Sequence, residues 1–215
     1  MKLYTYFRSS AAYRVRIALN LKGLDYEAVP VHLVRGGGEH RQPAYLGLNP
    51  AGLVPALEDQ GQVLTQSLAI IEYLEESHPQ PALLPAAPLD RARVRAIAQA
   101  IACDIHPVNN LRVLQYLTRE LDASEEQKNA WYRHWIGVGL QAVEAMLAGD
   151  ARTGAFCHGD TPGLADCCLV PQVYNAKRFE VDLTPYPTLR RINDHCLSLP
   201  AFDLARPEKQ GDAPK

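Results

Sequence analysis

The chain has 215 residues, and its 22 Lys and Arg side chains against 24 Asp and Glu give a formal net charge of −2 at pH 7. This balance, without a cluster of basic residues, argues against a nucleic-acid-binding protein, and no apolar run approaches the roughly 20 residues that span a bilayer. Since no signal-like segment opens the sequence, we expect a cytoplasmic protein with neither nucleic-acid nor membrane partners, long enough for two modest domains.

The first predicted elements are a strand and a helix that meet at Ser9 and Ser10. Residues 1–7 are rich in aromatic side chains, which is typical of a half-buried strand. From Ala11 the apolar positions recur every three or four residues, as on an amphipathic helix. The free N–H groups of a helix start favour an anion, so a serine hydroxyl there can stabilise a thiolate. The alternative is that one serine simply caps the helix.

The rest of the N-terminal part continues the alternation of strands and helices. We predict strands at 26–33, 54–57 and 63–64 and a helix from Ser67. The glycine triplet 36–38 is not followed by a Gly-Lys-Ser motif, so it indicates a flexible loop rather than a phosphate loop. This order of elements predicts an α/β, thioredoxin-like N-terminal domain over residues 1–80.

Prolines separate this domain from a helical one. Four prolines lie between residues 78 and 88, where no helix can continue, and we place the linker at 81–88. Residues 89–215 are predicted to form an all-α C-terminal domain, whose tail from Pro207 we expect to be disordered because it is rich in charge, proline and glycine. The predicted helices of this domain are 89–117 with a bend at Pro107, 124–147, 163–177 and 187–197.

The cysteines and histidines indicate neither a disulfide framework nor a metal site. All five cysteines follow residue 100, and an odd number without a CxxC pair is typical of reduced thiols in the cytosol. Cys167 and Cys168 lie in an apolar helical run, so we expect at least one of them in the core. Neither residue type has the spacing of metal ligands.

A series of ordered motifs extends along nearly the whole chain. The motifs are residues 7–19, which include Phe-Arg-Ser-Ser-Ala, and residues 49–57, 66–76, 159–166, 169–173 and 181–187. Together they resemble the zeta class of the glutathione transferase superfamily. The resemblance implies the glutathione transferase fold, glutathione as cofactor, a small dicarboxylic acid as substrate, and a homodimer.

The resemblance also implies which residues surround the glutathione thiol. Ser9 would hydrogen-bond the thiolate at the helix start, with Ser10 and Arg8 beside it as further catalytic residues. The zeta signature commonly has a cysteine where this chain has Ala11, so no protein thiol takes part. The family's polar residues at positions 52 and 53 are replaced by glycine and leucine, which puts a glutathione contact there in doubt.

Other residues of the first domain would hold the rest of glutathione. By resemblance, Val54 anchors the cysteinyl backbone in the manner of a β-strand, and the bond to Pro55 is expected to be cis, whereas the alternative is an ordinary edge-strand proline. Gln66 and Ser67 begin a helix, where they can hold the γ-glutamyl carboxylate. His40 would approach the glycyl end.

The helical domain contributes a polar segment around Pro107. His106, Asn109 and Asn110 are expected around one helical turn, where they would line a cleft and bind the cofactor. The alternative is a solvated bend at the proline.

Three arginines are candidates to bind the substrate carboxylates: Arg8, Arg112 and Arg178. The alternative for each is that it is an ordinary surface arginine. Arg14 and Arg16 face elsewhere on the first helix, and we predict structural roles for both.

Two aspartates in the region of the 163–177 helix are predicted to support the fold. The family has a threonine N-cap three residues before the buried Asp166, and here that position is Gly163. Because a glycine N-cap costs only a few tenths of a kcal/mol, the helix should still form. We therefore assign Asp160 and Asp166 to folding rather than to catalysis.

The activity implied by the resemblance is glutathione-dependent cis–trans isomerisation of maleylacetoacetate to fumarylacetoacetate, by thiolate addition, bond rotation and elimination. The alternatives are maleylpyruvate isomerisation in the gentisate pathway, a zeta-class transferase acting on α-haloacids, and a non-catalytic glutathione-binding protein. A hydrolase built on Ser9 is disfavoured because the chain has no Gly-x-Ser-x-Gly motif.

Overall fold

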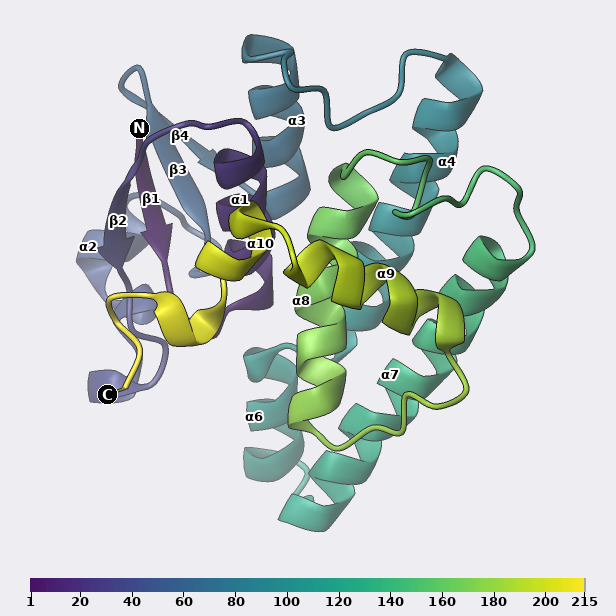
Figure 1. Ribbon diagram of the computed structural model, residues 1–215. Coiled ribbons are helices and arrows are strands. Elements are labelled where there is room, and N and C mark those ends of the chain that lie inside the picture. The colour runs from purple at the N-terminus through teal and green to yellow at the C-terminus, as the bar shows by residue number, and fades with distance from the viewer. Residues whose placement is uncertain (215) are drawn as a thin grey trace. The chain divides into compact units, whose positions relative to one another are not determined.

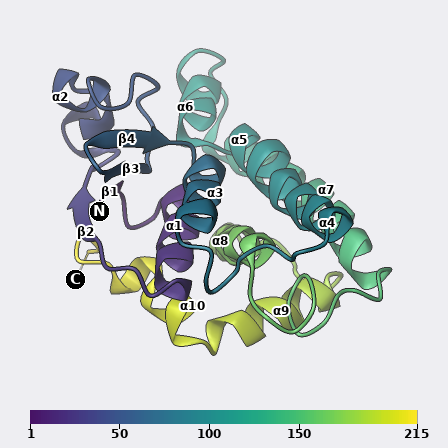
Figure 2. The ribbon, with the colours of Figure 1, turned by 90° about the horizontal axis from the view of Figure 1, so that it is seen from above.

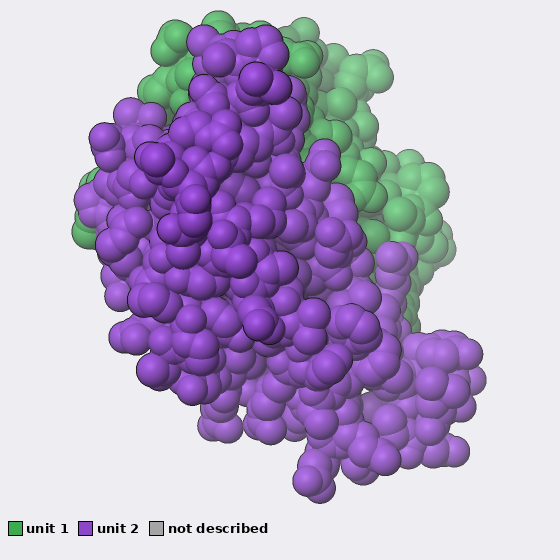
Figure 3. Space-filling model, turned by 90° about the vertical axis from the view of Figure 1, so that its right-hand side faces the viewer, with its two compact units in different colours: residues 1–83, 198–215 green, residues 84–197 purple. Residues whose placement is uncertain are grey.

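The computed structural model describes residues 1–214, which divide into two compact units distinguished by colour in Figure 3. The first unit consists of Met1–Leu83 and the chain from Ser198 onward, and the second is Leu84–Leu197. As expected, the first unit contains a mixed sheet and the second consists of helices (Figure 1). The predicted domains, residues 1–80 and 89–215, stay a prediction. The two compact units divide the chain differently, because the segment from Ser198 belongs to the same unit as the sheet.

A four-stranded sheet forms the centre of the first unit. Its strands are β1 (Lys2–Thr5), β2 (Glu27–Pro30), β3 (Ala56–Asp59) and β4 (Gln62–Thr65), in the order β2-β1-β3-β4. β1 runs parallel to β2 and antiparallel to β3, and β3 pairs antiparallel with β4. The predicted thioredoxin-like arrangement is therefore confirmed. β1 and β2 are shorter than predicted, β3 begins two residues later, and β4 is longer.

Helices cover this sheet. α1 (Ser10–Leu21) and α3 (Ser67–Ser77) lie side by side, as Figure 2 shows, and bury apolar faces that include Val15, Leu19 and Ile70. The short helix α2 (Pro43–Leu46) supplies Tyr45 to a second cluster of buried side chains that contains Tyr6, Val31 and Val54. Two 3₁₀ turns, Arg35–Gly37 and Glu39–Arg41, precede α2.

The C-terminal tail is ordered as far as residue 214, so the prediction of disorder from Pro207 is wrong over that stretch. After α10 (Pro200–Leu204), a 3₁₀ turn spans Pro207–Lys209, and Asp212 Oδ2 accepts a hydrogen bond of 2.9 Å from the N–H of Phe7. The buried Arg16 binds the carbonyl oxygen of Ala205 through Nε and that of Phe7 through Nη2. These contacts with distant residues order a tail whose composition alone indicates disorder.

A buried ion pair holds the start of the predicted linker against the first unit. Lys22 Nζ lies 2.8 Å from Glu75 Oε2 and donates to the carbonyl oxygens of His78 and Pro81. Glu75 also accepts a hydrogen bond from the N–H of Leu83. The ammonium and the carboxylate are thus both hydrogen-bonded, which is a condition for burying charges at low cost.

Six helices and a π-helical turn, Ala100–Ile105, make up the second unit as it is described. Almost all of α8 is buried, and it contacts both α4 and α9. None of the helices within residues 1–214 is long and apolar enough to cross a membrane. The helices are α4 (Pro88–Gln99), α5 (His106–Val108), α6 (Leu111–Arg119), α7 (Glu125–Ala148), α8 (Leu164–Arg178) and α9 (Pro187–Leu197).

The single helix predicted over 89–117 is wrong, because the chain forms four helical segments there. A π-helical turn follows α4, and α5 ends at Asn109, whose φ and ψ of −109° and 9° leave the helical region. Asn110 then begins α6 as its N-cap, its side chain accepting from the N–H of Arg112. Asparagine is a favoured N-cap, so it restarts the helix just after the predicted bend.

The start of α8 confirms the structural role of Asp166. Its Oδ2 accepts a hydrogen bond of 2.9 Å from the N–H of Gly163, the N-cap, and its Oδ1 accepts one of 2.9 Å from the N–H of Cys157. Asp160 similarly accepts from the N–H of Ala155. All five cysteines are free, and both Cys167 and Cys168 are fully buried.

Candidate functional site

Strand register brings three of the predicted binding segments to one end of the sheet. Ala56, at the start of β3, lies opposite Tyr4 of β1 on one side and Thr65 of β4 on the other. The chain that follows β1, the chain that precedes β3 and the chain that follows β4 therefore meet there. These segments carry Ser9 and Ser10, Val54 and Pro55, and Gln66 and Ser67, respectively.

Ser9 is the N-cap of α1. Its Oγ accepts a hydrogen bond of 3.2 Å from the N–H of Ala12, and its φ and ψ of −71° and 117° are those of a cap residue. Capping uses an oxygen lone pair, so the hydroxyl proton is still available to a ligand. Capping and thiolate stabilisation, which the sequence presented as alternatives, are thus compatible in one residue.

Ser9 has different neighbours on its two sides. Ser10 is only 7% exposed, within the first turn of the helix. Arg8 is half-buried beside the rings of Tyr6 and Phe7, with its guanidinium carbon 6.0 and 5.7 Å from the ring centroids. No hydrogen bond or salt bridge within residues 1–214 engages the Arg8 guanidinium. It is therefore a cation available to an anionic ligand next to the Ser9 hydroxyl.

The segment before β3 offers main-chain groups to a ligand. The Val54–Pro55 peptide bond is cis, as the resemblance implied. The carbonyl oxygen of Leu53 accepts hydrogen bonds from Tyr45 Oη at 2.6 Å and from Asn49 Nδ2 at 2.7 Å, which fixes the loop. Among the described residues, neither the N–H nor the C=O of Val54 makes a hydrogen bond. A peptide backbone could pair with both in the manner of an added strand.

The start of α3 forms the third part of this end of the sheet. Gln66 is the N-cap and has a positive φ of 69°, unusual for a residue other than glycine, so its backbone is held in a strained conformation. Ser67 is buried, and its Oγ accepts a hydrogen bond of 3.2 Å from Nη1 of Arg14. The first N–H groups of α3 and this cation together make a site suited to a carboxylate.

His40 is buried in the turn before α2. A Cβ on Gly38 would lie 2.4 Å from His40 Cε1 and 2.7 Å from Nδ1, so only glycine allows the imidazole its place. The main-chain oxygen of His40 lies close to Gly52, two residues before Val54. Burial, with the nearby charge of Arg41, lowers the pKa of His40, and its Nδ1 has no hydrogen-bond partner within residues 1–214. A buried ring nitrogen without a partner suits a polar ligand group.

The predicted residues of the second unit have partly structural roles. His106, Asn109 and Asn110 do not share one helical turn, because α5 ends and α6 begins between them. Asn109 is buried, and its Nδ2 donates to the carbonyl oxygen of Tyr132 at 3.5 Å, while its Oδ1 has no partner among the described residues. Asn110 caps α6. The predicted polar cluster is thus a helix junction.

The two arginines of the second unit lie at helix ends. Arg112 is exposed in the first turn of α6, and Arg178 is exposed in the last turn of α8. The Arg178 guanidinium lies over the ring of Phe179, which in turn stacks on Tyr132 with centroids 3.5 Å apart. Because Asn109 also contacts Tyr132, Arg178 and the polar junction are both attached to the same stretch of α7.

The sequence missed two residues that support the site. The sequence predicts a structural role for Arg14, yet the residue contacts Ser67, a predicted ligand residue. Its position on the apolar side of the first helix is the signal that it is buried. Gly38 belongs to the glycine triplet that predicts a flexible loop, but it provides the space for His40. A glycine two residues from a candidate histidine is a signal too weak to interpret without coordinates.

Comparison with known proteins gives a consistent result. Residues 3–82 match the family described as glutathione S-transferase, N-terminal domain. The chain is 57% identical over 215 residues to the maleylacetoacetate isomerase of Pseudomonas aeruginosa strain PAO1, covering 100% of this chain and 99% of that protein.

Two solved structures resemble it closely. The holo structure of maleylpyruvate isomerase, a bacterial zeta-class glutathione S-transferase, is 53% identical with a TM-score of 0.97 and full coverage of both chains. A maleylacetoacetate isomerase from Methylobacterium extorquens AM1, with bound malonate and glutathione, is 43% identical with a TM-score of 0.96, again over the full length of both chains.

Proposed function

The chain belongs to the zeta class of glutathione transferases, with the maleylacetoacetate and maleylpyruvate isomerases, and on that premise we propose that it isomerises maleylacetoacetate to fumarylacetoacetate. It is a glutathione-dependent enzyme. The single observation that best supports the proposal is Ser9, which caps α1 through its oxygen and keeps its hydroxyl proton for a ligand.

The residues around the sheet end fit glutathione. The unpaired N–H and C=O of Val54 suit its cysteinyl backbone, the start of α3 with Ser67 and Gln66 suits its γ-glutamyl carboxylate, and His40 with its unpartnered Nδ1 suits the glycyl end. By resemblance to the class, we also propose Asn109 of the second unit as a cofactor-binding residue. When bound, glutathione supplies the sulfur nucleophile that adds reversibly to the cis double bond and allows rotation about it.

Ser9 makes that nucleophile available at neutral pH. A free thiol has a pKa of about 8.5, so only a few per cent is ionised at pH 7. Lowering the pKa by two units takes about 2.7 kcal/mol, at 1.36 kcal/mol per unit. A hydrogen bond from the Ser9 hydroxyl to a thiolate contributes about 1.5–3 kcal/mol, and the end of α1 adds roughly 0.3–1 kcal/mol. Their sum of about 1.8–4 kcal/mol brackets the required value.

The arginines orient the substrate. Arg8 lies next to Ser9 and makes no hydrogen bond or salt bridge among the described residues, so it can bind a substrate carboxylate or stabilise charge that develops on the carbonyl oxygen conjugated to the double bond. Arg112 and Arg178 are proposed to bind the distal carboxylate. The isomerisation involves no net oxidation or reduction, since the cofactor leaves as it entered.

Maleylpyruvate is the second candidate substrate, favoured by the 53% identity to a maleylpyruvate isomerase of known structure and by Ala11 in place of the family cysteine. The test is a spectrophotometric assay with each substrate, with and without glutathione. We expect glutathione-dependent loss of the cis isomer with a higher kcat/KM for maleylacetoacetate. A higher value for maleylpyruvate would replace the proposed substrate, and turnover of neither would refute the proposal.

Two further properties are part of the proposal. We expect a homodimer in the cytoplasm, by analogy with the class. Light scattering on the purified protein should give a mass close to twice the 23.8 kDa of one chain. A mass of one chain at micromolar concentration would refute the dimer.

A further inference from the structure

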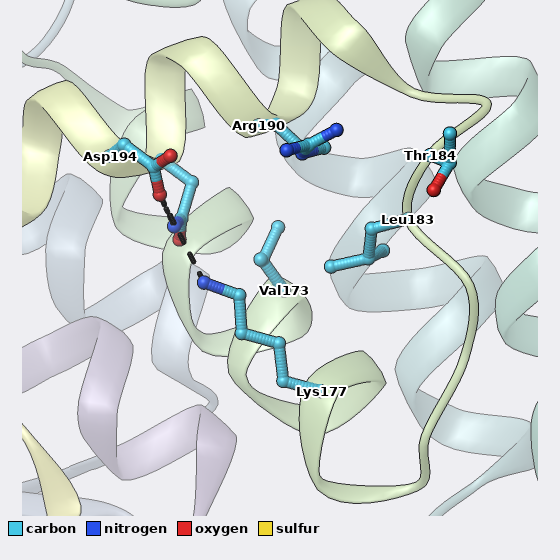
Figure 4. Close-up of a pocket in the computed structure, with 7 residues that line it drawn as sticks. Val173, Lys177, Leu183, Thr184, Arg190 and Asp194 are labelled. Atoms are coloured by element: carbon cyan, nitrogen blue, oxygen red, sulfur yellow. Dashed lines mark hydrogen bonds and ion pairs between the residues drawn. The ribbon is translucent and has the colours of Figure 1, made fainter.

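A small pocket lies between α8 and α9, entirely within the second unit. Its volume is about 280 Å³, just below the roughly 300–1,000 Å³ typical of small-molecule sites. Figure 4 shows Val173 and Lys177 entering it from α8, Arg190 and Asp194 from α9, and Leu183 and Thr184 from the segment that joins them. None of the predicted glutathione or substrate residues lines it.

The pocket has a fixed wall on the side of the connecting segment. The N–H of Thr184 donates to Asp182 Oδ1 at 2.9 Å, and the N–H of Tyr186 donates to the carbonyl oxygen of Leu183 at 3.0 Å. Tyr186 Oη in turn donates to the carbonyl oxygen of Gly137 on α7 at 3.1 Å. These bonds hold the segment in place, so a ligand would find the pocket already formed.

The acidic and basic side chains around the pocket differ in how far other residues engage them. Asp194 Oδ1 accepts a hydrogen bond of 3.0 Å from Nδ2 of Asn193 and lies 3.9 Å from Lys177 Nζ. Asp194 is thereby engaged, although the long separation from Lys177 leaves that ammonium with donors to spare. Arg190 lies one turn before Asp194 on α9, yet no salt bridge or side-chain hydrogen bond holds its guanidinium within residues 1–214.

A neutral polar group and apolar walls complete the pocket. Asn193 is only 2% exposed, and no described residue donates to its Oδ1. Val173, 1% exposed, and Leu183 provide hydrocarbon surface. Arg190 interacts electrostatically with the nearby Asp182 but makes no salt bridge within residues 1–214, so its hydrogen-bond donors remain for a ligand. Over an apolar floor these donors fit an anion that carries a hydrocarbon body, because a guanidinium binds a carboxylate through two parallel hydrogen bonds.

We propose that the α8–α9 pocket binds a small organic carboxylate, whose charged group lies between Arg190 and Lys177 and whose apolar body rests on Val173 and Leu183. The site is separate from the isomerase chemistry and does not depend on the proposed function. It takes a single carboxylate, since Asp194 and the nearby Asp182 would repel a second negative charge in a space of this size.

Phenylacetate is the probe for this site. Methyl-labelled protein is titrated with it while the glutathione adduct of maleate saturates the active site, and the methyl signals of Val173 and Leu183 are followed. We expect saturable shifts of these signals, a dissociation constant raised about tenfold or more in Arg190→Gln, and no change in the control Arg119→Gln. Asp194→Asn, which frees Lys177, should bind phenylacetate more tightly.

Several outcomes would overturn the proposal. Absence of shifts at Val173 and Leu183, or an unchanged dissociation constant in Arg190→Gln, would remove the site. Equal binding of phenylethylamine would exclude recognition of a carboxylate. Tighter binding of phenylalanine than of phenylacetate would show that the acidic residues recognise an ammonium group, and the pocket would then be one for zwitterions.

Discussion

Replacing Asp166 by alanine is predicted to destabilise the second unit strongly. The carboxylate is 2% exposed and accepts one hydrogen bond from the N–H of Cys157 and one from that of Gly163, each 2.9 Å long. Alanine leaves both N–H groups without an acceptor, that of Cys157 buried and that of Gly163 partly buried. The loop before α8 and the first turn of the helix would then lose the group that joins them.

The size of the effect follows from these two bonds. A buried donor left without its partner costs about 1–3 kcal/mol, so the buried N–H of Cys157 and the partly buried N–H of Gly163 together cost at most about 2–6 kcal/mol. Part of this is offset, since burial raises the pKa of Asp166 and thus makes its ionised form unfavourable in the folded protein. We expect a net loss of roughly 2–4 kcal/mol for Asp166→Ala. Asp166→Asn keeps one acceptor oxygen and should lose about half as much.

Urea unfolding of wild type, Asp166→Ala, Asp166→Asn and the exposed control Asp160→Asn measures these differences. The control removes one of two acceptor oxygens at an exposed carboxylate and should have a much smaller effect. Isomerase activity is measured on the same samples below the unfolding transition. If Asp166→Ala unfolded at the wild-type urea concentration but lost activity, the residue would act in catalysis and the reasoning would be refuted.

Three other predictions concern packing, a buried charge and pH. Gly139→Ala should destabilise the protein by about 1–3 kcal/mol, because the new Cβ would lie 2.2 Å from an isoleucine of the π-helical turn, whereas Gly137→Ala has its nearest contact at 3.9 Å and should be close to neutral in urea unfolding. Glu75→Gln should cost about 3–5 kcal/mol in the same measurement, since it leaves the buried ammonium of Lys22 without its carboxylate, and an effect below about 1 kcal/mol would contradict this account. Because the pKa of His40 is lowered in the folded protein, the unfolded chain binds a proton at this residue more readily. The stability that neutral His40 contributes above about pH 6.5 is therefore lost as the pH falls through the folded pKa. Thermal unfolding of His40→Gln should depend less on pH in this range than that of wild type.

The local parts of the fold were predictable because they depend on neighbours in sequence. The strand–helix junction at Ser9 and Ser10 follows from a change of hydrophobic period, and the half of a capping box at Gly163 and Asp166 follows from spacing. The cis bond before Pro55 came from the resemblance, since no local pattern separates it from an ordinary edge proline.

The sequence could not reveal what depends on distant contacts. The tail is held by Arg16, whose Nε binds Ala205, 189 residues away, and by a bond from Phe7 to Asp212. Asn110 has the same side chain whether it lines a cleft or caps a helix, and only the backbone break at Asn109 shows that it caps. In both cases tertiary structure decided between readings that composition alone could not separate.

The central claim is that the Ser9 hydroxyl lowers the pKa of the glutathione thiol, and the most direct test is to titrate that thiol in the bound state. The ultraviolet absorbance of the thiolate is followed against pH in wild type, Ser9→Thr and Ser9→Gly; glycine keeps most of the N-cap stability without the hydroxyl. We predict a pKa about two units below that of free glutathione in wild type, a similar value in Ser9→Thr, and a return to within about half a unit of the free value in Ser9→Gly. Equally low values in all three proteins would contradict the claim and transfer the role to another group of the site.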